Sequence, residues 1–435
     1  MPEIIRPLVS RKADILLYPG LSILLLACAY YFVMHAAYFL GHAIAFDWNI
    51  FVNSAKAYIS TGRLYEKGLW LYGPGAAIYK FPPFFLSIVI FFFQNGVSAE
   101  SLWFWNAMIH IALYICTGAI ILLSLKRHHT FLLYLLAAIF LLSFEAFFDN
   151  FLRLQLEIYV VFLVSLGIFF LNQRRYFASG FCLGISVGLK IYPAFFCIGL
   201  ITRRDYRSLV GLLAGFFSTA AISLTTINSS EHWHYFTQIM PHMLSENMSL
   251  VPDNISITHL LMLLGCKESI TRYIATSCLI LAIVIVVSGV IFYEYTKNIS
   301  KNNTAAINED PADAFRIASG FSVLVAGFVV GAQNSWWNYQ LLLMIPIITS
   351  MVLLMDKRYF NWLGLFAIFL SALLIYCGSN RNLPGLMTFI SSVTGNRNVM
   401  PSMLLTSVYL RTVASMLVYI ASAGLYWRVL REQAK

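Results

Sequence analysis

The stretch ILLYPGLSILLLACAYYFVMHAAYFL (Ile15–Leu40) contains 26 consecutive residues without Lys, Arg, Asp or Glu. A helix of about 20 apolar residues spans the roughly 30 Å hydrocarbon core of a bilayer. Arg6, Arg11 and Lys12 precede the stretch, and it is too long for a signal-peptide core of roughly 7–15 residues. It therefore predicts a first transmembrane helix rather than a cleaved signal.

The rest of the chain repeats this apolar pattern. The sequence is 60% hydrophobic and only 11% charged, whereas a soluble domain is about a quarter charged. Its seven cysteines lie mostly in apolar runs without metal-ligand spacing, so we expect them to be packing residues. We predict an all-α polytopic membrane protein with a single domain over residues 1–435. Other long apolar runs are Leu102–Leu125, Leu209–Ile227, Ile274–Phe292 and Tyr359–Cys377.

The positive charges choose between two topologies. If Tyr79–Phe93 crosses the bilayer, the basic loops at Lys126, Arg174 and Arg203 all lie outside, against the positive-inside rule. If it dips into the membrane and returns, these loops lie inside, and the double proline at 82–83 suits such a segment. We therefore expect about twelve crossings with both termini cytoplasmic. The expected helices cover residues 15–40, 101–125, 131–148, 157–172, 176–190, 191–201, 207–228, 270–296, 314–332, 339–355, 359–377 and 404–427.

Two long segments then lie outside, residues 41–100 and 228–267, and long loops on one face commonly carry function. Each contains apolar residues at helical spacing, which predicts a helix lying in the membrane interface. In the first segment these residues are Trp48, Phe51, Val52, Ala55, Tyr58 and Ile59, and in the second Trp233, Phe236, Met240, Met243 and Leu244.

Asp47 directly follows the first predicted transmembrane helix. One interpretation is that its carboxylate caps the helix that begins at Trp48. The other is that it acts as a general base at the outer membrane surface. Both roles are compatible only if one carboxylate oxygen stays free.

A polar cluster lies at the outer ends of the third and fourth predicted helices, and Lys190 interrupts another apolar stretch. Ionisable groups at membrane depth are costly, so they are usually paired or functional. Either these groups form structural ion pairs, or Arg153 and Lys190 form a cationic pocket for a lipid phosphate. The cluster comprises Glu145, Asp149, Arg153, Gln155 and Glu157.

Several other chemistries lack support in the sequence. There is no Walker motif, dinucleotide fingerprint or nucleophile elbow. His232, His234 and His242 have no Cys or Glu at ligand spacing, so we expect no metal site and no cofactor. The net charge of +10 is explained by basic cytoplasmic loops, so we expect no nucleic-acid partner.

Four motifs in order resemble the C-type membrane glycosyltransferases, and most closely glycosyltransferase family 87. They are Phe46-Asp47 with Tyr79-Lys80-Phe81-Pro82-Pro83, then Leu154-Gln155, then Gly188-Leu189-Lys190-Ile191-Tyr192-Pro193, and finally Ser335-Trp336-Trp337-Asn338-Tyr339. The resemblance implies the C-type fold, a polyprenyl-phosphate-sugar donor, a glycolipid or glycan acceptor, and inversion at the anomeric carbon. Asp47 matches the family's catalytic aspartate of the first outer loop.

The resemblance also suggests roles for the other motif residues. Gln155, Lys190 and Trp337–Tyr339 match positions that line the family's cavity, but Asn338 stands where a histidine is frequent, which puts an acid/base role there in doubt. We expect Arg153, Lys190 and Lys80 to bind the donor phosphate. Trp48, Trp336 and Trp337 either stack on sugar rings or belong to an interfacial aromatic belt. The expected substrate-binding residues are Trp48, Gln155, Glu157, Tyr192, Trp337, Asn338 and Tyr339.

Two other functions stay open for a polytopic chain of this kind. A transporter or flippase of lipid-linked saccharides is disfavoured because the two halves show no internal repeat. An O-antigen polymerase or ligase is disfavoured because the largest outer loop comes first and the last one contains only Arg381 and Arg397. We expect an enzyme of a bacterial inner membrane whose active site faces the periplasm or exterior.

Overall fold

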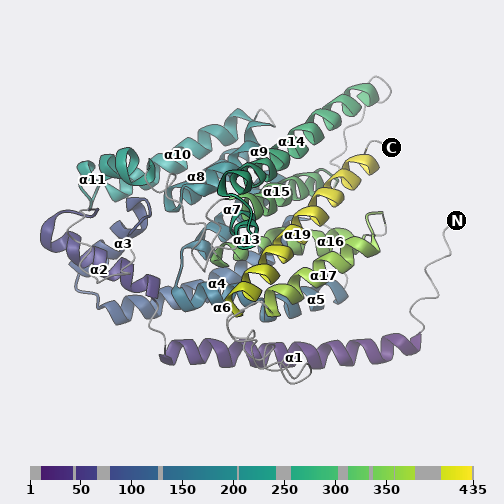
Figure 1. Cartoon of the computed structure of the whole chain (residues 1–435), viewed down its shortest axis with the longest axis horizontal. Helices are drawn as coiled ribbons and strands as arrows, with labels where there is room; N and C mark the ends of the chain where they lie inside the picture. Colours follow the sequence, from purple (N-terminus) through teal and green to yellow (C-terminus); the bar gives the residue numbers. More distant parts are fainter. Residues whose placement is uncertain are drawn as a thin grey trace.

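The computed structural model describes residues 11–42, 46–65, 79–125, 131–202, 205–241, 256–301, 312–332, 337–356, 358–377 and 403–433, and every regular element in these ranges is helical (Figure 1). The predicted all-α class is therefore confirmed for the described residues. The α-helices are α1 (Arg11–His42), α2 (Phe46–Thr61), α3 (Pro83–Gln94), α4 (Ala99–Ser124), α5 (Phe131–Ser143), α6 (Glu145–Arg153), α7 (Glu157–Asn172), α8 (Tyr176–Leu189), α9 (Ile198–Ile201), α10 (Tyr206–Ser223), α11 (Ser229–His234), α13 (Ile257–Leu263), α14 (Glu268–Lys301), α15 (Ala312–Gly331), α16 (Met344–Leu354), α17 (Trp362–Cys377) and α19 (Met403–Gln433). The 3₁₀ helices η2 (Tyr192–Cys197) and η4 (Trp337–Leu343) and the π-helix η3 (Tyr235–Ile239) complete the described elements.

Five described helices are long and apolar enough to cross a membrane. A sixth span results if α5 and α6, which meet at an angle of 41°, count as one. A helix lies at each of the twelve predicted places, but twelve crossings are not confirmed, because several of these helices have 17 residues or fewer. The five spans are Pro19–Tyr38, Ala99–Ser124, Glu268–Tyr295, Asp313–Gly331 and Thr406–Gln433.

The segment that decided the predicted topology forms the short helix α3. This helix has 12 residues and starts directly after Pro82, so it is about 18 Å long and cannot span the bilayer by itself. The chain turns after it through Gly96, whose φ of +80° suits glycine, and Ser98 then caps α4. The length of α3 fits a dip into the membrane, while the side on which it lies stays a prediction.

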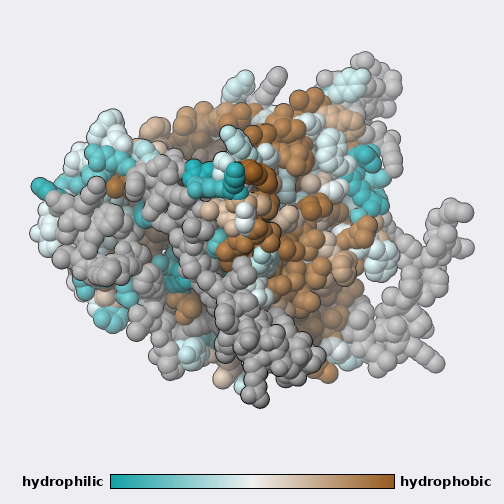
Figure 2. All heavy atoms as spheres, viewed as in Figure 1, coloured by the Kyte–Doolittle hydropathy of each residue, from teal (hydrophilic) through white to brown (hydrophobic). Residues whose placement is uncertain are grey.

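Helices α2 and α11 lie away from the two chain ends of the bundle. The start of α1 and the end of α19 both lie at the right of Figure 1, away from α2 and α11 at the left. Hydrophobic residues cover the middle of this face, and hydrophilic residues gather around α2 and α11 (Figure 2). This distribution is typical of a membrane bundle with polar helices at one end.

Helices α8 and α10 pack backbone against backbone. A Cβ atom added at Gly180 would lie 1.8 Å from the Ser208 carbonyl oxygen, and one at Gly211 would lie 2.1 Å from that of Phe177. Small residues at such spacing let membrane helices approach closely. This contact fixes α8, and α8 ends at Lys190, which lies in the candidate site.

A buried ion pair ties the last helix to the centre of the protein. Arg411 of α19 has no exposed surface, and its Nη2 donates to Asp149 Oδ2 of α6 at 2.6 Å. Its Nη1 also donates to Gln340 Oε1 of η4 at 3.3 Å, and Gln340 Nε2 donates back to the Arg411 carbonyl. The pair therefore connects α6, η4 and α19, which are remote in sequence.

Replacing Arg411 with Met should strongly destabilise the protein, because the Asp149 carboxylate then stays buried without its cation. The expected loss is about 3–5 kcal/mol, seen as a lower unfolding temperature in detergent. The control Arg358→Met removes the half-exposed partner of Asp356 and should cost about 0–1 kcal/mol. Equal unfolding temperatures for Arg411→Met and the wild type would contradict this account.

Candidate active site

Asp47 lies in the first turn of α2 and is 7% exposed. Its Oδ2 accepts a hydrogen bond from Gln155 Nε2 and lies 4.0 Å from Arg153 Nη1. Both contacts fall on the same oxygen, so Oδ1 has no hydrogen bond within the described part of the chain. Among these residues the carboxylate therefore contacts other side chains rather than capping its own helix, and one oxygen is left for another partner.

The Asp47 partners come from a sharp turn between α6 and α7. Arg153 ends α6, and Leu154 follows with φ +49° and ψ +48°, a left-handed conformation that is costly for a residue with a side chain. This turn brings Arg153 and Gln155 to the same carboxylate. Backbone strain at a non-glycine residue is typical of functional sites.

His110 of α4 contacts the backbone of this turn. The imidazole is fully buried, with Nε2 2.9 Å from the Gln155 carbonyl oxygen and Nδ1 2.8 Å from that of Asn106. The Asn106 amide oxygen in turn accepts from the Tyr159 hydroxyl at 2.5 Å. The Gln155 side chain thus donates a hydrogen bond to Asp47, while its backbone carbonyl contacts His110 of α4.

Burial raises the pKa of the Asp47 carboxyl. The Arg153 charge and the Gln155 hydrogen bond act in the opposite direction, because both stabilise the ionised form. The charges of Glu157 and Lys190 also reach Asp47, raising and lowering its pKa respectively. A carboxylate with a raised pKa is a stronger base than an ordinary aspartate, provided that it is ionised.

Lys190 forms a buried ion pair with Glu157 at the start of α7. The two side chains are 4% and 0% exposed, and Asn150 Nδ2 donates to the other Glu157 oxygen at 3.3 Å. The Lys190 ammonium also lies 4.5 Å from the centre of the Phe81 ring and 5.4 Å from that of Tyr339. Of the two interpretations given for Lys190, a structural ion pair or a phosphate-binding cation, this conformation shows the ion pair.

An aromatic wall continues from Lys190. The Tyr192 ring stacks on Phe328 at 4.8 Å and lies 4.9 Å from the ring of Tyr339. Among the described residues, the Tyr192 hydroxyl and the Gln155 amide oxygen are buried without a hydrogen-bond partner. Buried polar atoms of this kind usually have a partner, so two unsatisfied ones beside Asp47 and Lys190 mark a place for a polar ligand.

The remaining predicted residues lie at different places. Trp48 is 4% exposed and packs against Phe51, in the hydrophobic core. Lys80 is half-buried in the extended segment before α3. The side chains of Trp337 and Asn338 lie outside the described part of the structure, so their predicted contacts stay predictions.

The two segments that are predicted to lie outside, here called the first and second outer segments, contact each other. Glu231 of α11 accepts hydrogen bonds from the backbone N–H groups of Leu64 and Tyr65, at 2.8 and 3.3 Å. The Tyr65 hydroxyl donates to the Phe81 carbonyl at 2.8 Å, and its ring packs against that of Tyr235. The second outer segment therefore helps to position Phe81, whose ring covers Lys190.

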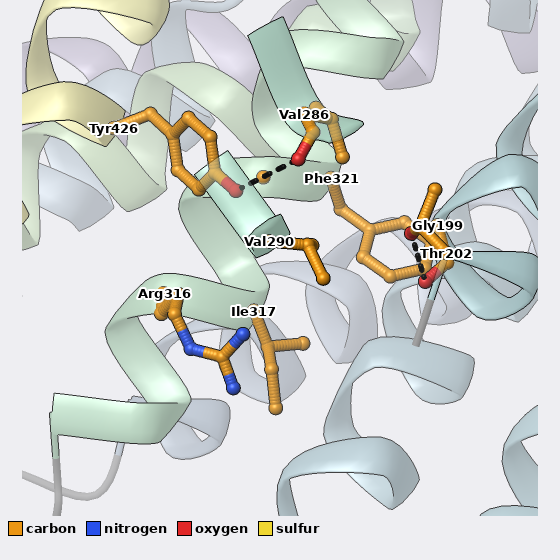
Figure 3. A pocket seen from close by; sticks show the side chains of 9 residues that line it. Gly199, Thr202, Val286, Val290, Arg316, Ile317, Phe321 and Tyr426 are labelled. Carbon is orange, nitrogen blue, oxygen red and sulfur yellow. Dashed lines mark hydrogen bonds between the residues drawn. The ribbon is translucent and has the colours of Figure 1, made fainter. Parts of the chain in front are cut away.

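A small cavity between α14, α15 and α19 does not belong to this site (Figure 3). Its volume is about 20 Å³, enough for a single water molecule. Tyr426 donates to the Val286 carbonyl on one side, and Thr202 donates to that of Gly199 on the other.

The described residues contain no group of three His, Cys, Asp or Glu side chains placed to hold a metal ion.

The structure brings together most of the predicted polar residues but also shows contacts that the sequence did not reveal. Within the predicted cluster, Asp149 pairs with Arg411, and Glu145 accepts a hydrogen bond from the Tyr31 hydroxyl. His110 and the left-handed Leu154 gave no recognisable signal. Arg411 did give one, because it is an arginine inside an otherwise apolar stretch.

The sequence model of glycosyltransferase family 87 matches residues 70–308, which is more than half of the chain. The chain belongs to this family. Its sequence is also similar to that of a curated mannosyltransferase. The resemblance read from the four motifs is therefore confirmed.

A curated relative of this family 87 chain is the polyprenol-phosphate-mannose-dependent alpha-(1-2)-phosphatidylinositol mannoside mannosyltransferase of Mycobacterium tuberculosis (strain ATCC 25618 / H37Rv). The two are 25% identical over 257 residues, which cover 54% of this chain and 58% of the relative, less than two thirds of its length. No solved structure matches the chain. The family match includes Arg153, Gln155 and Lys190 but begins after Asp47, so the role of Asp47 rests on its geometry and on the motif resemblance.

Replacing Gln155 with Met should move the acid limb of the pH–rate profile to higher pH. Catalysis by a base requires ionised Asp47, so activity is lost as the pH falls through its pKa. The Gln155 hydrogen bond lowers that pKa, and its removal should raise it. The measurement is kcat/KM for sugar transfer against pH.

The control for this experiment is Gln173→Met, at the exposed C-terminal end of α7, which should leave the profile in place. An unchanged acid limb in Gln155→Met, or a shift to lower pH, would show that Asp47 is not the ionising group.

Proposed function

We propose that this protein transfers mannose or a similar hexose from a polyprenyl-phosphate donor to a hydroxyl group of a glycolipid or glycan acceptor. The proposal depends on the buried Asp47 carboxylate. One of its oxygens contacts Gln155 and Arg153, and the other has no hydrogen bond within the described part of the chain. The printed name of the mycobacterial relative supports the donor class.

The proposed reaction is a single displacement. Asp47 takes the proton of the acceptor hydroxyl while that oxygen attacks the anomeric carbon of the sugar. The bond from the anomeric carbon to the phosphate oxygen breaks, and polyprenyl phosphate leaves with the electron pair. One sugar bond forms and one breaks with inversion. Because a phosphate is already a good leaving group, the departing oxygen does not need a general acid.

Among the basic residues of the site, Arg153 is the best candidate for binding the donor phosphate. Its side chain is 24% exposed and lies 4.0 Å from Asp47, whereas Lys190 is buried against Glu157. The planar guanidinium also matches two phosphate oxygens at once. Lys190 contacts the phosphate only if Glu157 releases it, and half-buried Lys80 is proposed as a third contact from the first outer segment.

The sugar is proposed to bind between Asp47 and the aromatic wall. The Gln155 amide oxygen accepts a hydrogen bond from one sugar hydroxyl there. The Tyr192 hydroxyl donates a hydrogen bond to a second sugar hydroxyl or accepts one from it. The Tyr339 ring supplies an apolar surface for a sugar face. Glu157, Trp337 and Asn338 stay proposed substrate contacts, and Trp48 contributes by packing α2 in place.

We further propose that the protein lies in a bacterial inner membrane with this site on the periplasmic or exterior face. The described helices include five that are long enough to span a membrane, and Asp47 follows one of them by a short connection. The positive-inside distribution of the loops supports this orientation.

Replacing Asp47 with Asn should abolish transfer while leaving expression and folding intact. Loss of a general base typically costs about 10²–10⁴ in rate. The assay incubates purified protein in nanodiscs with radiolabelled polyprenyl-phosphate-mannose and a membrane glycolipid extract, and identifies the product by mass spectrometry.

The matched control is Asp205→Asn, because Asp205 caps α10 and asparagine caps a helix equally well. This variant should keep wild-type activity. Full activity of Asp47→Asn would refute Asp47 as the base, and uptake or flipping of the donor without a new glycosidic bond would refute the transferase.

A further inference from the structure

The imidazole of His110 is a buried polar group that the proposed reaction does not use. It belongs to α4 and lies beside the ring of Phe151 on α6 and that of Tyr159 on α7, with centroid distances of 6.5 and 5.3 Å. The planes of the Tyr159 and His110 rings are at 89° to each other, which is an edge contact. Aromatic contacts from two neighbouring helices therefore fix the position of the imidazole.

The backbone carbonyl of Gln155 depends on this imidazole for its hydrogen bond. In the described part of the chain no backbone N–H donates to this carbonyl, and its partner is His110 Nε2 at 2.9 Å. The Gln155 N–H, by contrast, donates to the Asn150 carbonyl at 3.2 Å, at the end of α6. Since buried carbonyl groups rarely lack a donor, His110 supplies a contact that the turn between α6 and α7 does not provide by itself.

The surroundings of the two ring nitrogens identify the donor. Both nitrogens face carbonyl oxygens, which can only accept hydrogen bonds, so a neutral imidazole can donate to one of them. The Asn106 carbonyl, 2.8 Å from Nδ1, lies inside α4, where the backbone N–H of His110 is its regular helical donor. The Gln155 carbonyl has no such donor, so Nε2 carries a proton whether the ring is neutral or cationic.

The residue before Gln155 has a strained backbone. Leu154 has φ +49°, and a left-handed conformation of a residue with a side chain persists only where the surrounding structure holds it. This turn brings Arg153 and Gln155 to the same oxygen of Asp47. Relaxation of Leu154 would turn the Gln155 side chain away from Asp47, and a donor on α4 that holds the next carbonyl opposes this relaxation.

We propose that His110 is a positioning residue that acts on Asp47 through Gln155: its Nε2–H fixes the Gln155 backbone and thereby keeps the Gln155 amide on Asp47 Oδ2. The Gln155 hydrogen bond favours the ionised carboxylate, which is the form that can accept a proton from the acceptor. This inference rests on the proposed function, in which Asp47 is the base, and adds a residue that controls how readily this base ionises.

Titration of Asp47 tests the proposal without an activity assay. The full-length protein in nanodiscs is labelled with [γ-¹³C]aspartate, and the Asp47 signal is the one that Asp47→Asn removes. His110→Phe keeps an aromatic ring between Phe151 and Tyr159 but removes the donor for Gln155. We expect the Asp47 pKa to rise by at least half of its rise in Gln155→Met, and the double variant to show no further rise, because both changes act on one hydrogen bond.

The matched control is Tyr114→Phe. Tyr114 lies one turn after His110 on α4, is buried, and donates to the Leu141 carbonyl at 2.7 Å. Its replacement removes a buried bond to a carbonyl from the same helix, so it should lower the unfolding temperature and leave the Asp47 titration unchanged. All these variants keep the charged groups that reach Asp47, which are Arg153, Glu157 and Lys190.

Three results would overturn the proposal. They are an unchanged Asp47 pKa in His110→Phe, shifts that add in the double variant, and an equal shift in Tyr114→Phe, which would show a general loosening of α4.

The contact is also measurable in the wild type, should His110→Phe fail to fold. Solid-state NMR on protein with ¹⁵N-labelled histidine and ¹³C-labelled glutamine carbonyl should show dipolar transfer from His110 Nε2 to the Gln155 carbonyl carbon, in a signal that Gln155→Met removes. Absence of this transfer would contradict the inference. Absence of sugar transfer in the activity assay would instead refute the proposed function and leave both NMR measurements unaffected.

Discussion

The contact between the Asp47 carboxylate and the turn after α6 is the constraint on which the site depends. It joins α2, the first element after the first span, to α6 and α7, whose residues are about a hundred positions later in the sequence. A carboxylate with so little exposure requires a hydrogen-bond donor and a nearby cation. Gln155 and Arg153 supply both on one oxygen, and this leaves the other oxygen for the acceptor hydroxyl of the proposed reaction.

Other buried carboxylates of the bundle are also paired with a cation. Glu157 is paired with Lys190, and Asp149 with Arg411, in places where water is largely excluded. Removing one partner of such a pair is far more costly than removing both, so each pair fixes the relative position of two helices. The pairs connect α7 to the end of α8 and α6 to α19, and the charges of the Glu157–Lys190 pair also reach Asp47.

Hydropathy alone predicted where the helices lie, because each helix depends on residues within its own segment. It did not predict how many of them span the membrane: α7 and α8 are apolar but have only 16 and 14 residues. Four candidates were recognisable because charged and amide groups in apolar surroundings are costly and are usually paired or functional. They are Asp47, Arg153, Gln155 and Lys190. The contact between Asp47 and Gln155 was not recognisable, since these residues are 108 positions apart and meet only in the folded chain.

The conformation of the site was the least predictable part. Leu154 belongs to one of the recognised motifs, but nothing in the sequence indicates its left-handed backbone, which directs the side chains of Arg153 and Gln155 toward Asp47. His110 likewise reads as an isolated histidine, because its partners are backbone carbonyl oxygens. Such contacts depend on tertiary structure and leave no pattern in residue types.

The central claim is that a single carboxylate base promotes direct displacement at the anomeric carbon. The most direct test is the configuration of the product, determined by proton NMR from the coupling between the anomeric proton and carbon in sugar labelled with ¹³C. The account predicts that the transferred sugar has the configuration opposite to that in the polyprenyl-phosphate donor. Retention of the donor configuration would require a covalent sugar–enzyme intermediate or a second displacement, and would contradict the role assigned to Asp47.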